Sequence, residues 1–374
     1  MTNHARKDIA DITVAFEQAQ SRGKRSALAT LVLVVGSSYH RPGSRLLITE
    51  DGHLTGTISG GPLEGEILRS AFLSIEEGQN RLIRYDATDE MVANFGHEYG
   101  CNSIIYILFE PIHEEDVCNP IQLMRLHSYK REDAVLVTLF SLKREGQLGT
   151  RLLYRKWDQL GILPVNIHEA IRWDMESVLQ NKCSSFRLYE EEDQHFDVFM
   201  EFLSPSLALI IAGAGNEARP LVDFGRIMGW HITVIDERPS HATPDRFENA
   251  NQVIVARADE LVKHFQMDYR TVFLLMTHNY SSDFNLLKKL VLMGCSYIGI
   301  SGSIERYERL LKDLRKEEGA IRKNMPGCIF VPLGQKTGAE TAEQIAASVV
   351  SEIEAAIQSQ WINSEKRSPS KRPN

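Results

Sequence analysis

A strand, a glycine-rich turn, a helix and a second strand follow one another in the C-terminal half and constrain the fold most strongly. Leu207 to Ala212 is a continuous apolar run, and Gly213-Ala214-Gly215-Asn216-Glu217-Ala218 follows it directly. A helical pattern then extends to Met228, and the next strand, His231 to Ile235, ends at Asp236. This order is the βαβ unit in which the G-x-G-x-x-G/A fingerprint occurs. The chain therefore predicts a Rossmann-type unit that holds a nucleotide or a similar phosphate-bearing cofactor.

Each small residue of this turn has a physical role in such a unit. Gly213 permits the tight turn, Gly215 lets the backbone approach a phosphate, and Ala218 keeps the helix close to the strand. The helix N-terminus offers free N–H groups to an anion. Asp236 would accept hydrogen bonds from ribose hydroxyls, while Arg238 would tolerate a 2′-phosphate, so the choice between NAD and NADP stays open. The alternative is a packing turn whose ligand has been lost.

Further strands and helical patterns complete a doubly wound parallel sheet. Ligands in such sheets lie beyond the carboxyl ends of the strands, where Thr277 and His278 follow an apolar strand. His278 is a candidate for ligand binding or proton transfer, or else a structural histidine. We expect this domain to span residues 206–358, followed by a disordered tail at 359–374. The strands are predicted at Gln252–Ala256, Thr271–Met276, Tyr297–Ser301 and Cys328–Pro332.

The first 205 residues contain an internal repeat. Gly43-Ser44-Arg45-Leu46-Leu47 matches Gly149-Thr150-Arg151-Leu152-Leu153, and a leucine lies eleven residues after the first glycine in both copies. Both copies continue into a helical pattern and close on similar segments, Leu108 to Pro111 and Phe202 to Pro205. A chance match is the alternative. We predict one α+β domain over 1–205, with repeat units at about 1–115 and 130–205.

The first copy contains candidate functional residues, of which the Gly60-Gly61 turn and Cys101 have no counterpart in the second copy. Paired glycines, Gly60 and Gly61, precede a helix and form a turn suited to anions. Glu64 at the helix start would either cap the helix or bind a polar ligand. Cys101, beside Asn102 in a loop, is a candidate functional thiol that could ligate a soft metal or carry sulfur. A residue that only the fold requires should tend to appear in both copies.

Composition excludes several classes of protein. The formal net charge of −8 argues against a nucleic-acid partner. Five scattered cysteines match neither a disulfide framework nor a zinc site. The charged N-terminus is not a signal peptide, and no apolar run approaches the roughly 18 residues that span a bilayer. We expect a soluble cytoplasmic protein, with a homodimer as the default oligomer.

Three motifs of the N-terminal half resemble the N-terminal domain of the XdhC/CoxI family: Gly36 to Gly43, the turn Ile58-Ser59-Gly60-Gly61-x-Leu63-Glu64, and Tyr99-Gly100-Cys101-Asn102. The Gly213 turn, Met276-Thr277-His278 and the segment from Gly338 to Ala346 resemble its C-terminal Rossmann domain. The match covers nearly the whole chain in the family's order.

This resemblance implies an accessory protein of a molybdenum hydroxylase such as xanthine dehydrogenase, rather than an enzyme. It implies binding of the molybdenum cofactor, as molybdopterin or its nucleotide form, support of its sulfuration with a cysteine desulfurase, and delivery to the apo-hydroxylase. The phosphate or nucleotide part would lie at Gly213, Gly215 and Asn216. The metal-dithiolene end would face the Gly60-Gly61 turn and Cys101, the candidate molybdenum ligand, across a cleft between the two domains.

One departure from the family affects this expectation. The family commonly has cysteine after the paired glycines, where this chain has Pro62, and proline also removes an N–H group. If that cysteine ligates molybdenum or carries sulfur, this chain relies on Cys101 alone or has a changed role.

The competing hypotheses are an NAD(P)-dependent oxidoreductase with His278 as proton donor, and a regulatory module that binds a nucleotide and a partner without chemistry.

Overall fold

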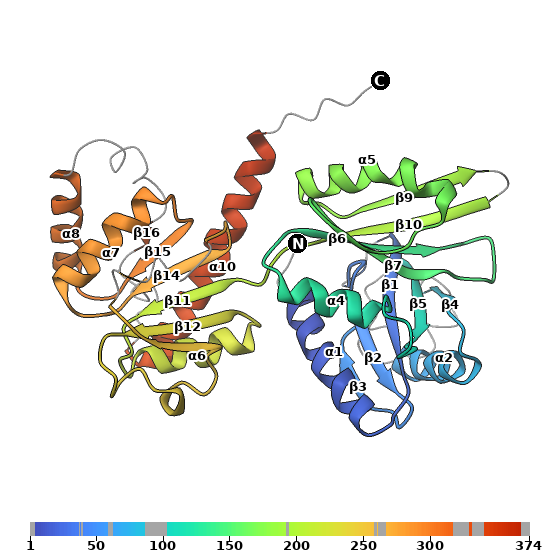
Figure 1. Ribbon diagram of the computed structural model, residues 1–374, viewed down its shortest axis with the longest axis horizontal. Helices are drawn as coiled ribbons and strands as arrows, with labels where there is room; N and C mark the ends of the chain where they lie inside the picture. The colour runs from blue at the N-terminus through green and yellow to red at the C-terminus, as the bar shows by residue number, and fades with distance from the viewer. Residues whose placement is uncertain are drawn as a thin grey trace. The chain divides into compact units, whose positions relative to one another are not determined.

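The computed structural model describes residues 4–36, 38, 40–58, 63–86, 103–191, 194–257, 260, 267–316, 329–330 and 340–367. The chain forms two compact units, Met1–Pro205 and Ser206–Asn374. Both units combine helices with sheets of their own and have their own cores (Figure 1). The predicted fold class is confirmed: antiparallel sheets form the first unit and a parallel sheet forms the second.

The first unit begins with helix α1 (His4–Ser21), whose apolar side chains Ile9, Ile12 and Phe16 are buried at the helical spacing expected from the sequence. A five-stranded antiparallel sheet follows, in the order β3-β2-β1-β5-β4. Its elements are β1 (Ser26–Gly36), β2 (Arg45–Thr49), β3 (Leu54–Gly56), α2 (Glu64–Glu77), β4 (Arg81–Asp86) and β5 (Ser103–Pro111).

The second half of this unit repeats the same topology. Its antiparallel sheet has the order β8-β7-β6-β10-β9, which is the order of the first sheet with each strand replaced by its repeat counterpart. The elements are α4 (Pro120–Tyr129), β6 (Ala134–Phe140), β7 (Gly149–Arg155), β8 (Gln159–Gly161), α5 (Val165–Asn181), β9 (Ser185–Glu191) and β10 (Gln194–Leu203).

The two sheets pack face to face between two outer helices. Val32 and Leu108 of the first sheet contact Phe140 and Phe199 of the second in one buried cluster. Helix α2 covers the outer side of the first sheet and α5 that of the second (Figure 1). Helices α1 and α4 contribute to a further cluster that also holds residues of both sheets. The repeat copies therefore share their core.

Two buried carboxylates connect the copies reciprocally. Glu201 on β10 accepts hydrogen bonds from Arg45 on β2, and its side chain lies where a Cβ at Gly43 would be, 2.5 Å from Oε1. Glu110 on β5 accepts from the backbone N–H of Thr150 at 2.6 Å and occupies the corresponding place at Gly149. Each copy thus requires a glycine where the other inserts a glutamate.

These contacts correct the sequence alignment of the copies. The matched segments ending at Pro111 and Pro205 pair Glu110 with Ser204, which is wrong by three residues. In the ladders Glu110 lies opposite Leu28 and Glu201 opposite Leu136, and these two leucines are equivalent in the repeat. The register is set by backbone pairing and by which side chain faces the core, whereas the prolines mark only where the strands stop.

The second unit is a six-stranded parallel sheet with the order β13-β12-β11-β14-β15-β16. Counted along the chain this is the 3-2-1-4-5-6 order of dinucleotide-binding folds. Its strands are β11 (Ala208–Ala212), β12 (His231–Asp236), β13 (Gln252–Val255), β14 (Thr271–Leu275), β15 (Tyr297–Ile300) and β16 (Ile329–Phe330).

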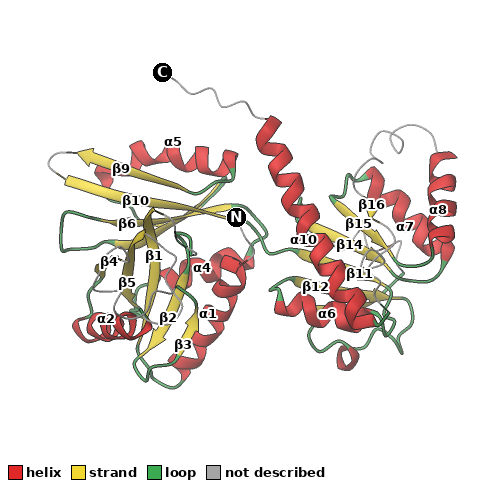
Figure 2. Cartoon of the chain, turned by 180° about the vertical axis from the view of Figure 1, so that it is seen from behind, coloured by secondary structure: helices red, strands yellow, loops and turns green. Residues whose placement is uncertain are grey.

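Helices cover both faces of this sheet (Figure 2). Helices α6 (Ala218–Ile227) and α10 (Ala342–Arg367) pack on one face, and α7 (Tyr280–Leu292) and α8 (Ile304–Lys316) pack on the other. A short 3-10 helix, η1 (Pro244–Arg246), follows β12. The doubly wound arrangement leaves the carboxyl ends of the strands free of covering helices, which is where a ligand site is expected.

The last helix differs from the sequence prediction at its end. Thr341 and Gln344 form the reciprocal capping box that the sequence indicates, with Gln344 N–H donating to Thr341 Oγ1 at 3.3 Å and Gln344 Oε1 accepting from the N–H of Glu340 at 2.9 Å. The helix then continues to Arg367, so residues 359–367 are helical rather than part of a disordered tail. Extending an existing helix costs little, and the first proline beyond it is Pro369.

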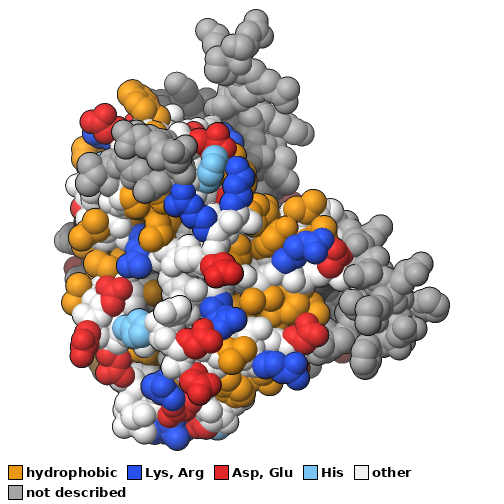
Figure 3. Space-filling model, turned by 90° about the vertical axis from the view of Figure 1, so that its right-hand side faces the viewer, with side chains coloured by type: hydrophobic (Ala, Val, Ile, Leu, Met, Phe, Trp, Pro, Cys, Tyr) orange, Lys and Arg blue, Asp and Glu red, His pale blue; other side chains and the backbone are white. Residues whose placement is uncertain are grey.

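The described helices and one face of the molecule were compared with what a membrane segment or a one-sided charge pattern would require. No described helix is long and apolar enough to cross a bilayer. On the side shown in Figure 3, hydrophobic side chains lie among acidic and basic ones, and neither sign of charge forms a continuous field.

Candidate functional site

The glycine turn after β11 leads directly into helix α6. Two turn hydrogen bonds start α6, from Ala218 N–H to the Gly215 carbonyl and from Arg219 N–H to the Asn216 carbonyl, both at 3.2 Å. Among described residues, the N–H groups of Gly215, Asn216 and Glu217 find no protein acceptor. Glu217 is the N-cap of α6 but forms no side-chain cap. These donors at a helix N-terminus suit a phosphate.

Gly213 holds the ends of two strands together. Its φ of +120° is a conformation that side chains avoid, and a Cβ there would overlap the carbonyl group of Met276 at the end of β14. Its N–H donates to Ile235 on β12 at 2.8 Å. Gly215 has open space around its Cβ position, as close backbone approach to a ligand requires. The two glycines therefore act differently, one in packing and one at the open surface.

Asp236, predicted as the acceptor for ribose, is buried at the end of β12. Its Oδ2 accepts from the N–H of Ala214 at 2.8 Å and from Arg238 Nη2 at 2.7 Å. Its Oδ1 accepts from the N–H and Nε of Arg238, at 2.9 and 2.8 Å. Although burial alone would raise it, these hydrogen bonds hold the pKa of Asp236 at about 2. The carboxylate is ionised and connects the glycine turn to Arg238.

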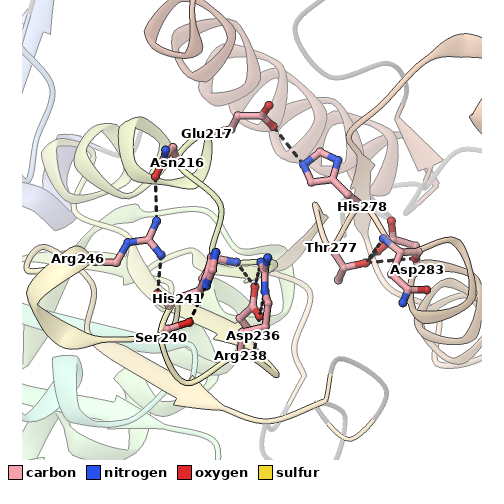
Figure 4. Close-up of polar contacts among 12 residues, drawn as sticks. Asn216, Glu217, Asp236, Arg238, Ser240, His241, Arg246, Thr277, His278 and Asp283 are labelled. Carbon is pink, nitrogen blue, oxygen red and sulfur yellow. Dashed lines mark hydrogen bonds and ion pairs between the residues drawn. The ribbon is translucent and has the colours of Figure 1, made fainter.

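A second arginine lies on the same side of the sheet (Figure 4). Arg246 of η1 donates to Asn216 Oδ1 at 2.9 Å and to the His241 carbonyl at 3.1 Å. Ser240 Oγ lies 3.1 Å from His241 Nδ1 in the intervening loop. The loop after β12 thus brings two guanidinium groups and two polar side chains beside the start of α6. The sequence prediction missed Arg246 because thirty residues separate it from Asn216 and no motif links them.

Thr277 and His278 follow β14 on the other side of the turn. Thr277 Oγ1 donates to Asp283 Oδ1 at 2.6 Å, and Arg306 of α8 donates to Asp283 Oδ2 at the same distance. Burial raises the pKa of the fully buried Asp283, and the bonds from Thr277 and Arg306 oppose that shift. Asp283 and Arg306 were not predicted, since they lie inside helical patterns. They fix the position of Thr277.

His278 adopts a left-handed backbone conformation, with a φ of +57°. Its Nε2 lies 3.5 Å from Glu217 Oε2, and its side chain is 54% exposed. Non-glycine residues adopt this conformation uncommonly, and such residues cluster at functional sites. The contact connects the β14 end with the N-cap of α6 (Figure 4).

A hollow lies between the ends of β12 and β14, across the glycine turn. All six predicted residues of this unit, Gly213, Gly215, Asn216, Asp236, Thr277 and His278, gather at this edge of the sheet. The hollow itself is lined by Ile235, Asp236, Glu237, Arg238, Thr277, Asn279 and Ser282. Its position at the switch point of the sheet is that of the nucleotide crevice in folds of this order.

Of the candidate residues in the first unit, the structure describes only Glu64. Glu64 is exposed in the first turn of α2, where its charge favours the helix dipole; the N-cap is Leu63, which forms no side-chain cap. Gly60, Gly61, Pro62, Cys101 and Asn102 lie outside the described residues. Within the described residues no group of three or more His, Cys, Asp or Glu side chains could hold a metal ion.

Strand order, glycine turn and the acid that ends β12 place the second unit in the Rossmann class of nucleotide-binding folds. Residues 209–353 match the model of the XdhC Rossmann domain, and residues 19–86 match that of the XdhC and CoxI family. The chain belongs to the XdhC/CoxI family.

Individual relatives extend the likeness over most of the chain. A Bacillus subtilis protein, described as a probable xanthine dehydrogenase subunit, is 29% identical over 88% of this chain and 92% of its own length. The molybdenum cofactor insertion chaperone PaoD of Escherichia coli is 23% identical over 90% of this chain and 85% of its own length. A crystal structure described as a xanthine dehydrogenase from Bacillus halodurans has a TM-score of 0.72 and 26% identity, and the alignment covers 96% of this chain and 98% of that one.

Proposed function

We propose that this chain is an accessory protein of a molybdenum hydroxylase of the xanthine dehydrogenase type. It binds the molybdenum cofactor, assists its sulfuration and delivers it to the apo-hydroxylase. The observation that carries the proposal is the glycine turn after β11, where the N–H groups of Gly215, Asn216 and Glu217 are uncommitted among described residues. The likeness to an insertion chaperone, which covers 90% of this chain and 85% of that protein, supports the role.

The residues at this turn fit the phosphate end of the cofactor. Backbone N–H groups at a helix N-terminus and the nearby Arg246 are donors for a phosphate ester. The cofactor supplies the molybdenum centre of the hydroxylase that receives it. On sequence grounds, the Gly60-Gly61 turn and Cys101 are the proposed contacts of the metal end, with a cysteine desulfurase as the source of sulfur. We also propose a cytoplasmic homodimer.

Cofactor retention tests the proposal directly. The purified full chain is incubated with molybdenum cofactor released from a hydroxylase and then gel-filtered, and its molybdenum and pterin contents are measured. We expect near-stoichiometric retention, since a carrier must hold the cofactor through transfer. Activation of apo-hydroxylase by the loaded protein measures delivery, and gel filtration with light scattering measures the oligomeric state.

Variants assign the retained cofactor to its contacts. Cys101→Ser should weaken retention of the cofactor by removing the contact with its metal end. Gly215→Asp should repel the phosphate, and the open space at Gly215 accommodates the new side chain. Cys183→Ser is the matched control, because Cys183 is an exposed free cysteine that has no proposed role. Unchanged retention in both Cys101→Ser and Gly215→Asp would contradict the assignment. No retention by the unmodified protein would contradict the proposed function itself.

A nicotinamide-dependent oxidoreductase is the second candidate, favoured by one observation. The 3-2-1-4-5-6 strand order and the crevice beside Asp236 are those of dinucleotide-binding folds. His278 would be the proton donor, held by Glu217 at 3.5 Å. Consumption of reduced nicotinamide with a carbonyl substrate, lost in His278→Gln, would favour this function over the accessory role.

A further inference from the structure

We propose that the hollow between β12 and β14 selects a nucleotide that carries a phosphate on its ribose 2′-oxygen, as NADP does, over one with a free 2′,3′-diol. Arg238 and Arg246 are the specificity-determining residues. The inference rests on the proposed phosphate site at the glycine turn and concerns a dinucleotide as a second ligand of that site, besides the molybdenum cofactor.

The first argument is that Asp236 has no acceptor capacity left for a ribose diol. A carboxylate has about four lone-pair positions. Four protein hydrogen bonds occupy them here, three from Arg238 and one from the N–H of Ala214, at 2.7 to 2.9 Å. Folds that prefer NAD use the acid at this position to accept the ribose hydroxyls. In this chain the acid binds its own arginine instead.

The second argument is that Arg238 retains free donors. A guanidinium has five N–H donors, of which Nε and one on Nη2 bind Asp236. Nη1 donates to no described residue, and the side chain is 50% exposed. Asp236 balances the charge of Arg238 but leaves the N–H groups on Nη1 free to bind a ligand. A 2′-phosphate would therefore meet N–H donors rather than a repelling carboxylate.

Arg246 supplies the third argument because it is already held in place. Its bonds to Asn216 and to the His241 carbonyl use two of its five donors. The N–H of His241 in turn donates to the Arg238 carbonyl at 3.0 Å, so one turn positions both guanidinium groups. A side chain fixed before binding loses less entropy when a ligand arrives. The opposing charge is Glu237, an exposed residue that also lines the hollow.

The residues on the opposite wall of the hollow indicate that the ribose would lie beside the loop after β12. Thr277, Asn279 and Ser282 face Asp236 and Arg238 across the glycine turn. A nucleotide whose phosphate binds the start of α6 would lay its nucleoside in this hollow, with the 2′-oxygen beside the loop after β12. The recognised chemistry is a phosphomonoester next to a nucleoside.

Calorimetric titration of the purified full chain with NADP⁺ and with NAD⁺ tests the proposal. We expect NADP⁺ to bind at least about tenfold more tightly, because one charge-assisted hydrogen bond contributes that much. Arg238→Ala should reverse the order, since it removes donors for the phosphate and frees two acceptor positions of Asp236. Arg246→Met should weaken NADP⁺ more than NAD⁺, because Arg246 is also a proposed donor to the phosphate at the glycine turn, which both dinucleotides carry. Arg226→Met, at the far end of α6, is the matched control, and thermal unfolding verifies the fold of each variant.

The outcomes separate this inference from the proposed function. Equal or tighter binding of NAD⁺ by the unmodified chain would overturn the selectivity while leaving a nucleotide site in place. Binding of neither dinucleotide would overturn it too, and the cofactor-retention measurement on the same preparation then shows whether the phosphate site fails as well. An unchanged preference in both arginine variants would show that other residues set it.

Discussion

Replacing Arg45 with methionine is expected to destabilise the first unit by about 3–5 kcal/mol, because it leaves the Glu201 carboxylate buried without its partner. The two side chains are only 2% and 4% exposed, so water cannot replace the guanidinium. The hydrogen bond from Arg45 Nη1 to the Gly43 carbonyl, 2.9 Å long, is lost as well. For a unit of this size, this loss corresponds to a fall in melting temperature of roughly 6–20 °C.

Thermal unfolding of the full chain by circular dichroism measures this loss. Arg151→Met is the matched control, because Arg151 occupies the equivalent repeat position but its side chain is 42% exposed, and we expect a change below about 1 kcal/mol. Arg45→Met combined with Glu201→Leu should recover much of the stability, since apolar residues often replace a buried ion pair at little cost. Equal melting temperatures for Arg45→Met and Arg151→Met would refute the reasoning.

Two further predictions concern Glu110 and the glycine turn. Burial raises the pKa of Glu110 above 4.5, so the folded state holds a proton that the unfolded state releases, and the unfolding free energy falls as pH rises from 4.5 through the raised pKa. Glu110→Gln, which keeps the contacts with Thr150, should flatten this dependence in urea unfolding at several pH values; an unchanged slope would contradict the assignment. Gly213→Ala should cost a few kcal/mol through its overlap with Met276, whereas Gly215→Ala should change stability by less than about 1 kcal/mol and weaken only ligand binding. Equal melting temperatures for the two alanine variants would show that Gly213 is not required for packing.

Much of the fold was predictable because its signals are local. The run from Leu207 to Asp236 carries strand, turn, helix and strand in sequence order, and the structure has β11, α6 and β12 there. Residues at the ends of these strands meet because parallel strands share one edge. This explains why Asp236 and Thr277, far apart in sequence, were predicted to lie at the same site.

The contacts that define the site in detail were not predictable. The bond between Arg246 and Asn216 and that between Arg306 and Asp283 depend on where separate elements pack, and neither arginine lies in a motif. Four protein hydrogen bonds to Asp236 also leave its carboxylate without a free acceptor position for ribose, contrary to the sequence prediction. Sequence indicates which backbone positions approach a ligand, whereas side-chain pairing is decided by the tertiary fold.

The reciprocal insertion of Glu110 and Glu201 has a consequence for how this protein can vary. Each half of the first unit supplies a buried glutamate that packs against the glycine of the other half. We therefore expect that neither half folds without the other. A change at either glycine must be matched by a change in the opposite half. Loops outside this shared core need no matching change in the other half. Functional residues can therefore arise in the loops of one half while the other half keeps the residues that the fold requires.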